Sequence, residues 1–264
     1  FPSSSAGAEE GPSPREGHSL SAVPGSGALV LFGGSPAFRS GEDGHATAWF
    51  NDLWIFQSLS EGALGEGGCW YRIPCQGALP KPRASHDAHV IVGGDGTACL
   101  VVHGGLVQQR YRVNDTWRVR LPKRNELTNL FRPAWEELGS ADADMVPVPR
   151  FHHATCIVGT RLVVFGGHNY ERRERNDTWV LEAGPATPVA AACWHKVAGS
   201  GGDPAVQVAG GPSGGRPAGL HPSPRAYCTL TALGPNGPVV LYGGSGARGQ
   251  HFKDIWVLFL RVGT

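Results

Sequence analysis

The sequence predicts an all-β repeat protein with four similar units, and three observations lead to this prediction. Of the 264 residues, 39 are glycine and 21 are proline, which favours short strands and tight turns over long helices. A short apolar run ends in Gly-Gly four times along the chain. Each run is followed by a segment in which Asp precedes Trp by two residues. Internal repetition constrains the fold more than any local pattern does, so the repeat is the main basis of the prediction.

The Gly-Gly runs are the first recurring element. They are ALVLFGG ending at Gly34, LVVHGG at Gly105, LVVFGG at Gly167 and VVLYGG at Gly244. A glycine pair allows positive φ and close backbone approach where a strand turns sharply. We therefore expect a strand to end at each pair.

The second recurring element is a strand centred on tryptophan. Its Asp and Trp residues are Asp52 and Trp54, Asp115 and Trp117, Asp177 and Trp179, and Asp254 and Trp256. Successive apolar residues beside each Trp indicate a sheet buried on both faces, and loss of one such Trp should cost about 3 to 5 kcal/mol. We expect each Asp to cap the turn by accepting backbone N–H groups.

Two further elements complete the unit. A Trp-led strand is expected at 70–73, 135–138 and 194–197, and a Pro-Arg pair precedes every Gly-Gly strand. For the arginines, a structural role in bonding loop carbonyls fits at least as well as binding, because they recur in every copy. These arginines are Arg15, Arg83, Arg150 and Arg225. His18, His86 and His153 follow three residues later, and we expect repeat symmetry to spread them too far apart for a metal site.

In this order the motifs resemble the kelch repeat over residues 14–260. The resemblance implies a kelch-type β-propeller whose blades have four antiparallel strands, the first innermost. The expected units are 14–81, 82–148, 149–223 and 224–264, after a disordered tail at 1–13. Successive Pro-Arg pairs lie 68, 67 and 75 residues apart, so each unit exceeds the typical repeat of about 50 residues. We place the surplus in loops and expect no structure between residues 198 and 223, which are mainly Gly, Pro and Ser.

The resemblance departs from the family pattern in blade number. Four blades are fewer than a kelch ring usually needs, and the last unit lacks a Trp-led strand after Leu260. We therefore expect a fragment of a larger propeller. An open four-bladed assembly with exposed edges is the alternative.

The family resemblance places the loops after Gly-Gly and those carrying Pro-Arg on one face. Arginine beside Tyr or Phe is typical of binding hot spots, because the guanidinium pairs with carboxylates while the rings exclude water. We therefore predict that this face binds a protein partner through an acidic segment. The alternative is that these residues are solvated loop residues. The partner would then bind the opposite loops, near 58–68 and 121–133. The predicted partner-binding residues are Arg39, Arg110, Tyr111, Arg112, Tyr170, Arg172, Arg173, Arg175, Arg248 and Phe252.

These features predict a protein–protein interaction module. Kelch propellers often follow an F-box or BTB domain, so the resemblance suggests a substrate adaptor of a ubiquitin ligase. A cytosolic scaffold or trafficking effector is the alternative, and a kelch-type enzyme is a less favoured one. The chain has no P-loop or H-E-x-x-H motif, and we predict no catalytic residue, cofactor or metal.

Charge and cysteine content limit the remaining classes of function and the cellular location. Lys and Arg total 23 against 22 for Asp and Glu, which disfavours nucleic-acid binding. No apolar run approaches the length of about 18 residues that spans a membrane. The six cysteines form no C-x-x-C and lie mostly in apolar runs, so we expect free thiols and a cytoplasmic or nuclear location.

Overall fold

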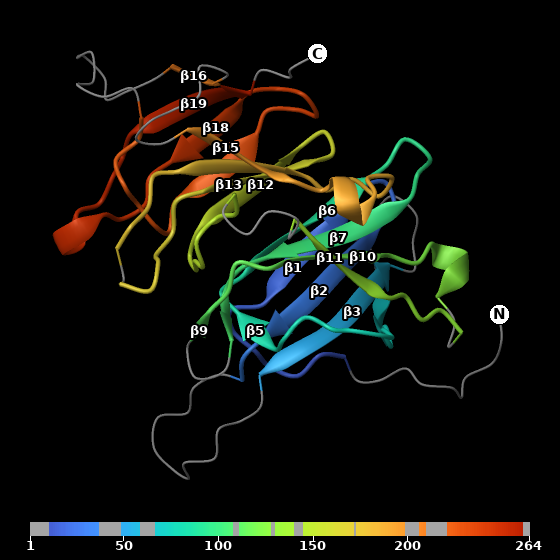
Figure 1. Ribbon diagram of the computed structural model, residues 1–264. Coiled ribbons are helices and arrows are strands. Elements are labelled where there is room, and N and C mark those ends of the chain that lie inside the picture. Colours follow the sequence, from blue (N-terminus) through green and yellow to red (C-terminus); the bar gives the residue numbers. More distant parts are fainter. Residues whose placement is uncertain are drawn as a thin grey trace, which may run out of the picture.

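The structure is a computed structural model that describes residues 11–36, 49–58, 67–107, 111–127, 130–139, 145–171, 173–198, 206–209 and 221–260. These residues form five antiparallel sheets, four of which have four strands (Figure 1). The all-β prediction is therefore confirmed. Most of the predicted tail at 1–13 lies outside the described residues.

Each four-stranded sheet contains one copy of the repeat. The first is β1 (Ser19–Val23), β2 (Ala28–Gly34), β3 (Phe50–Ser58) and β4 (Gly68–Arg72). The second is β6 (Asp87–Val92), β7 (Ala98–His103), β10 (Thr116–Arg120) and β11 (Trp135–Leu138). The third is β12 (Ala154–Val158), β13 (Arg161–Phe165), β14 (Thr178–Glu182) and β15 (Trp194–Ala198). The fourth is β17 (Thr229–Ala232), β18 (Val239–Tyr242), β19 (Ile255–Leu260) and β16 (Val206–Ala209).

The glycine pairs end the second strand of each sheet, as predicted. At Gly166 the backbone φ is +66°, and a Cβ atom there would lie 2.5 Å from the carbonyl oxygen of Arg225 in the next unit. Glycine is required here for both its conformation and its lack of a side chain.

Apolar cores fill the spaces between successive sheets. Trp117 belongs to the core between the first and second sheets, Trp179 to the next, and Trp256 to the core between the third and fourth. Each Trp thus packs against the sheet that precedes its own. The inner strands β1, β6, β12 and β17 contact one another in this order, and closure into a ring is not detected within the described residues.

The fourth sheet corrects a sequence prediction. We expected no structure between 198 and 223 and no outer strand for the last unit. Instead, β16 lies within that segment and pairs with β19 from Val206↔Leu260 to Ala209↔Val257 (Figure 1). The outer strand of this sheet therefore comes from the chain before the unit, whereas β4, β11 and β15 follow their partners.

A buried arginine stands at the centre of every unit. In the third, Arg150 is 0% exposed and donates from Nη1 to the Gly166 carbonyl at 2.9 Å. It also forms a two-pronged ion pair with Asp177, with N···O distances of 3.0 and 2.9 Å. The indole of Trp179 donates to the same carboxylate at 2.8 Å. Arg15, Arg83 and Arg225 repeat this arrangement in the other units, which bears out the structural role predicted for them.

The prediction that each Asp caps a turn was wrong about the main hydrogen-bond partners of these aspartates. Their principal partners are the guanidinium and the indole rather than turn amides, so each Asp fixes a side-chain network. Burial alone raises the pKa of Asp177, but the charge and hydrogen bonds of Arg150 lower it to about 2.

The same arginines join neighbouring units through their backbone. The Arg150 amide donates to the Val113 carbonyl at 3.3 Å, and the Gly105 amide donates to the Arg150 carbonyl at 3.0 Å. Beside this junction, the Asn114 side chain donates to the Pro147 carbonyl at 2.9 Å. Asn51 and Asn176 make equivalent bonds to the Pro80 and Pro222 carbonyls, so each Asn holds the segment that leads into the Pro-Arg pair of the next unit.

Three buried histidines line the junctions. His86 Nε2 lies 3.0 Å from Ser19 Oγ, and the rings of His103 and His153 lie 5.2 Å apart. Burial, aided by the charge of Arg83, lowers the pKa of His86 to about 3, and burial holds the pKa values of His103 and His153 well below the usual 6.5. Among the described residues, no group of three His, Cys, Asp or Glu side chains is placed to hold a metal ion.

The ion-pair network gives the first prediction. Arg150→Ala removes one partner of a buried pair and leaves the buried Asp177 carboxylate with only Arg175, at 3.6 Å, as a nearby cation, so we expect a loss of about 3 to 5 kcal/mol of unfolding free energy. The control is Arg161→Ala, whose pair with Glu182 is about one-third exposed and should be worth about 1 kcal/mol or less. Urea unfolding of both variants measures the difference. Equal losses would show that the network does not govern stability.

The histidines give a second prediction. Their folded-state pKa values lie below the unfolded value of about 6.5, so the unfolded chain binds more protons and stability falls as pH drops below that value. Each such group contributes up to about 1.4 kcal/mol per pH unit. His153→Cys copies the fourth unit, which carries Cys228 at this position, and should lessen the loss of urea midpoint between pH 7 and pH 5. His251→Gln, at an exposed histidine, is the control; identical acid sensitivity in wild type and His153→Cys would refute the assignment.

Candidate functional site

The loops after Gly-Gly and those carrying Pro-Arg meet at one end of the sheets. In the second unit they form a small sheet of β5 (Arg83–Ala84), β8 (Leu106–Val107) and β9 (Tyr111–Arg112). Bridges from Phe151 to His168 and from Ala226 to Ser245 repeat this pairing in the next two units. We call this end of the molecule the loop face.

A connected group of rings and one arginine lies on the loop face, and we call it the aromatic cluster. The Arg112 guanidinium lies 5.1 Å from the Phe151 ring centre and 5.7 Å from that of Tyr170. The Tyr170 hydroxyl donates to the Arg112 carbonyl at 2.9 Å, which fixes the ring beside the cation. The cluster consists of Arg112, Phe151, His152, His168, Tyr170 and Tyr227.

The histidines connect the two ends of the cluster. Phe151 lies 4.7 Å from His152 and 5.4 Å from His168, and His152 stacks on Tyr227 at 4.2 Å with an interplanar angle of 28°. Burial, with a smaller contribution from His168, lowers the pKa of His152 to about 4. His152 is therefore neutral at physiological pH and acts as a flat ring rather than a cation.

The predicted site residues fall into three groups. Arg112 and Tyr170 belong to the aromatic cluster, and Tyr111 is exposed beside them. Arg173 is exposed and pairs with Glu171 at 3.1 Å, while Arg248 is exposed on the loop of the fourth unit. Arg39, Arg110 and Arg172 lie outside the described residues.

Arg175 and Phe252 take part in the buried networks beneath the loop face. An Arg175 nitrogen lies 3.6 Å from the Asp177 carboxylate. The Arg225 guanidinium lies 3.9 Å from the Phe252 ring centre, as Arg15 lies 4.0 Å from Phe50 in the first unit. Phe252 therefore supports the central arginine of its unit, whatever it contributes to binding.

Sequence reasoning missed four members of the cluster: Phe151, His152, His168 and Tyr227. Three of them lie directly after a Pro-Arg pair, within the repeat that we assigned to architecture. The sequence did contain one signal: the residue two positions after the arginine differs between the copies, whereas the Pro-Arg pair before it recurs.

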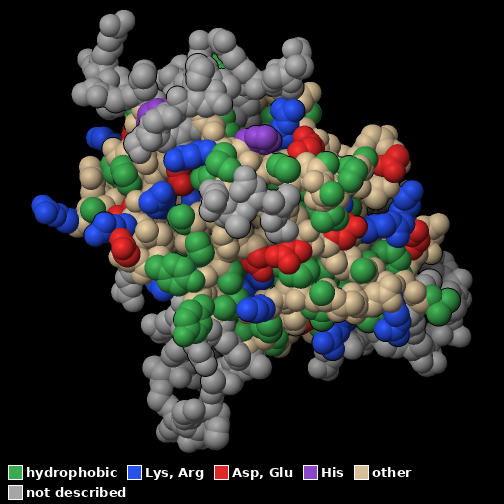
Figure 2. All heavy atoms as spheres, viewed as in Figure 1, with side chains coloured by type: hydrophobic (Ala, Val, Ile, Leu, Met, Phe, Trp, Pro, Cys, Tyr) green, Lys and Arg blue, Asp and Glu red, His purple; other side chains and the backbone are tan. Residues whose placement is uncertain are grey.

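The charge distribution fits local recognition rather than polyanion binding. Figure 2 shows basic side chains scattered among acidic and hydrophobic ones on the face in view, without a large block of one sign among the residues drawn in colour. In the described part of the chain, no helix is long and apolar enough to span a membrane.

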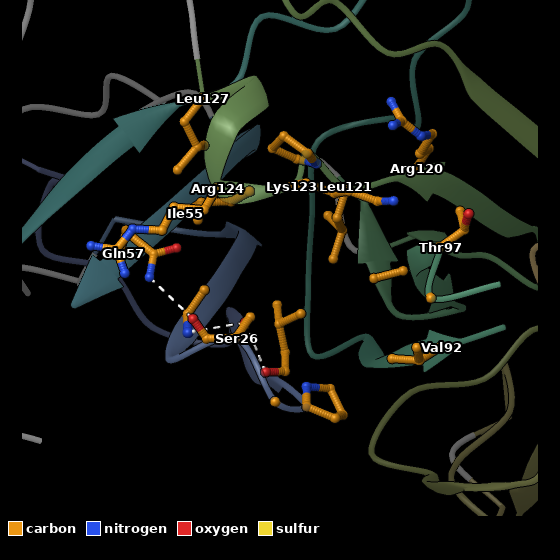
Figure 3. Close-up of a pocket in the computed structure, with 17 residues that line it drawn as sticks. Ser26, Ile55, Gln57, Val92, Thr97, Arg120, Leu121, Lys123, Arg124 and Leu127 are labelled. Carbon is orange, nitrogen blue, oxygen red and sulfur yellow. Dashed lines mark hydrogen bonds between the residues drawn. The ribbon is translucent and has the colours of Figure 1, made fainter. Parts of the chain in front are cut away.

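A pocket of about 250 Å³ lies at the opposite end of the first two sheets (Figure 3). Ala28, Ile55 and Leu121 belong to the core beneath it, and the Gln57 side chain donates to the Ser26 carbonyl at its wall. Arg120, Lys123 and Arg124 also line it, but Arg120 is bound by Glu126 at 2.7 Å. This is part of the opposite surface considered in the sequence analysis, and it supplies a matched control for the loop face.

Comparisons with known proteins agree with the repeat. Residues 66–211 match the KLHDC2/KLHL20/DRC7 Kelch-repeats domain family. The chain is 30% identical over 251 residues to a putative adagio-like protein 2 of Oryza sativa subsp. japonica, covering 94% of this chain and 33% of that protein. It is 28% identical over 250 residues to an F-box/kelch-repeat protein of Arabidopsis thaliana, covering 94% of this chain and 42% of that protein. The human host cell factor 2 is 28% identical over 169 residues, 63% of this chain and 19% of that protein. The chain thus spans less than half the length of each of these relatives.

Proposed function

The chain belongs to the kelch-repeat family, and from this premise we propose that its loop face binds an acidic segment of a partner protein. Kelch domains are typically binding modules without catalytic activity. The site itself must carry the rest of the argument, because one fold supports many functions.

The observation that carries the proposal is the setting of Arg112. Its guanidinium lies close to two aromatic rings on an exposed face, and Tyr170 is held in place by its hydrogen bond to the Arg112 carbonyl. Rings around a guanidinium exclude water from an ion pair and strengthen its attraction for a carboxylate. Rigid aromatic residues beside arginine are also the composition of interface hot spots.

The surrounding charges support the same partner class. Exposed Arg173 and Arg248 lie on neighbouring loops of this face, so an acidic segment that crosses it meets several cations. Glu171 neutralises part of this charge by pairing with Arg173. The attraction is therefore local, and it should weaken with salt as exposed contacts do.

A more specific role is that of substrate adaptor in a ubiquitin ligase. The relative from Arabidopsis thaliana, which is an F-box/kelch-repeat protein, favours this role. A scaffold or trafficking role would use the same face. All six cysteines are free thiols, which fits the reducing conditions of the cytoplasm or nucleus.

The third prediction tests the loop face directly. A phage-displayed library of random peptides is selected on the wild-type chain, and we expect enrichment of Asp and Glu. Arg112→Ala should weaken binding of the selected peptides at least about tenfold, because it removes the cation between the rings. The double change Arg173→Ala, Arg248→Ala should have a similar effect. Binding is measured by titration at low and high salt.

Lys123→Ala is the matched control, since it removes one exposed cation from the opposite end of the sheets. It should leave the affinity unchanged. Selected peptides without acidic residues, or an affinity that responds to Lys123→Ala and not to Arg112→Ala, would reject the loop face in favour of the opposite surface.

A further inference from the structure

One position on the loop face has left-handed backbone in all four units. It lies two residues after each central arginine and is occupied by Gly17, Ser85, His152 and Tyr227. The φ angles are +64°, +53°, +51° and +57°, respectively. Only glycine adopts this conformation without steric cost, and the cost is greater for bulky side chains.

The fold imposes this conformation on each copy. The Ser85 amide donates to the Gly17 carbonyl at 2.8 Å, and the Tyr227 amide donates to the His152 carbonyl at 3.0 Å. These bonds join the same position of successive units, so the backbone there is fixed by the contact between units. Glycine in the first unit shows that the backbone needs no side chain at this position.

The three non-glycine residues therefore have a strained backbone, although the hydrogen bond between units does not require their side chains. Strain of this kind persists at binding sites, where the side chain serves another purpose. Tyr227 is 59% exposed, and its hydroxyl makes no hydrogen bond to the described residues. His152 stacks on it, and His168 lies 5.6 Å away at the edge of the ring.

We infer that His152 and Tyr227 are specificity-determining residues that contact the partner segment on the loop face. This inference rests on the proposed function and names the residues that select among acidic segments. The stacked rings of His152 and Tyr227 offer an apolar surface and a phenol in the same cluster as the Arg112 cation. The segment they fit carries an apolar side chain close to its acidic residues.

A purely structural role makes the opposite prediction for stability. If the stacked pair mainly holds the third and fourth units together, removal of a ring destabilises the fold. If the rings serve recognition, glycine relieves the backbone and the fold is at least as stable as before. Thermal unfolding therefore separates the two roles without any ligand.

The experiment compares Tyr227→Gly and His152→Gly with the wild type, using the acidic peptides selected from the phage library. We expect melting temperatures equal to or above that of the wild type and affinities reduced about tenfold or more. Tyr227→Phe keeps the ring and should retain most of the affinity. Tyr242→Ala removes a tyrosine of similar exposure, 51%, from β18 and should leave binding unchanged.

The possible outcomes distinguish this inference from the proposed function, which is the binding of an acidic segment by the loop face. Unchanged affinity in both glycine variants, while Arg112→Ala weakens binding, overturns the inference and leaves the proposed function standing. A lower melting temperature in both glycine variants assigns the rings to structure and also overturns it. Failure of the wild type to select acidic peptides, or indifference of their binding to Arg112→Ala, removes the proposed function and this inference together.

Discussion

The interaction on which the structure depends is the contact of one buried arginine with an aspartate, a glycine carbonyl and, through the aspartate, a tryptophan indole. Arg150 is 0% exposed, so each of its nitrogens must find a partner inside the protein. The Asp177 carboxylate, the Gly166 carbonyl and the Val148 carbonyl provide them. Neither charge could remain buried without the other, which makes the motif indivisible and explains why its parts recur together.

This network also determines where the loops lie. The Arg150 side chain binds its own unit, while its backbone amide and carbonyl bind Val113 and Gly105 of the preceding unit. One residue thus fixes both the packing within a sheet and the junction between sheets. The described residues of the aromatic cluster lie close to these junctions, where backbone hydrogen bonds between units hold the chain in place. A preorganised surface of this kind loses less entropy when a partner binds.

Sequence reasoning could predict the fold because the network has a fixed chemical signature. The Pro-Arg, Gly-Gly and Asp-x-Trp motifs recur, and their residue types are the ones that the contacts require. The outer strand β16 was not predictable in the same way, because Val206–Ala209 has no leading Trp and precedes the unit that it completes. The aromatic cluster was missed for a different reason. Nothing in the identity of His152 or Tyr227 indicates a left-handed backbone, which only comparison with Gly17 reveals.

The buried network residues and the position two residues after each central arginine have different roles. Central residues such as Arg150 and Asp177 are occupied by one another, by nearby carbonyls and by the Trp179 indole, so they are not available to a ligand. The position of Gly17, Ser85, His152 and Tyr227 has its backbone fixed by the junction, but its side chain is unconstrained by the network. Substitutions there change the surface without changing the contacts that define the unit. A repeated fold can therefore acquire a particular partner by varying this position in each copy independently, while every copy keeps the same buried arginine.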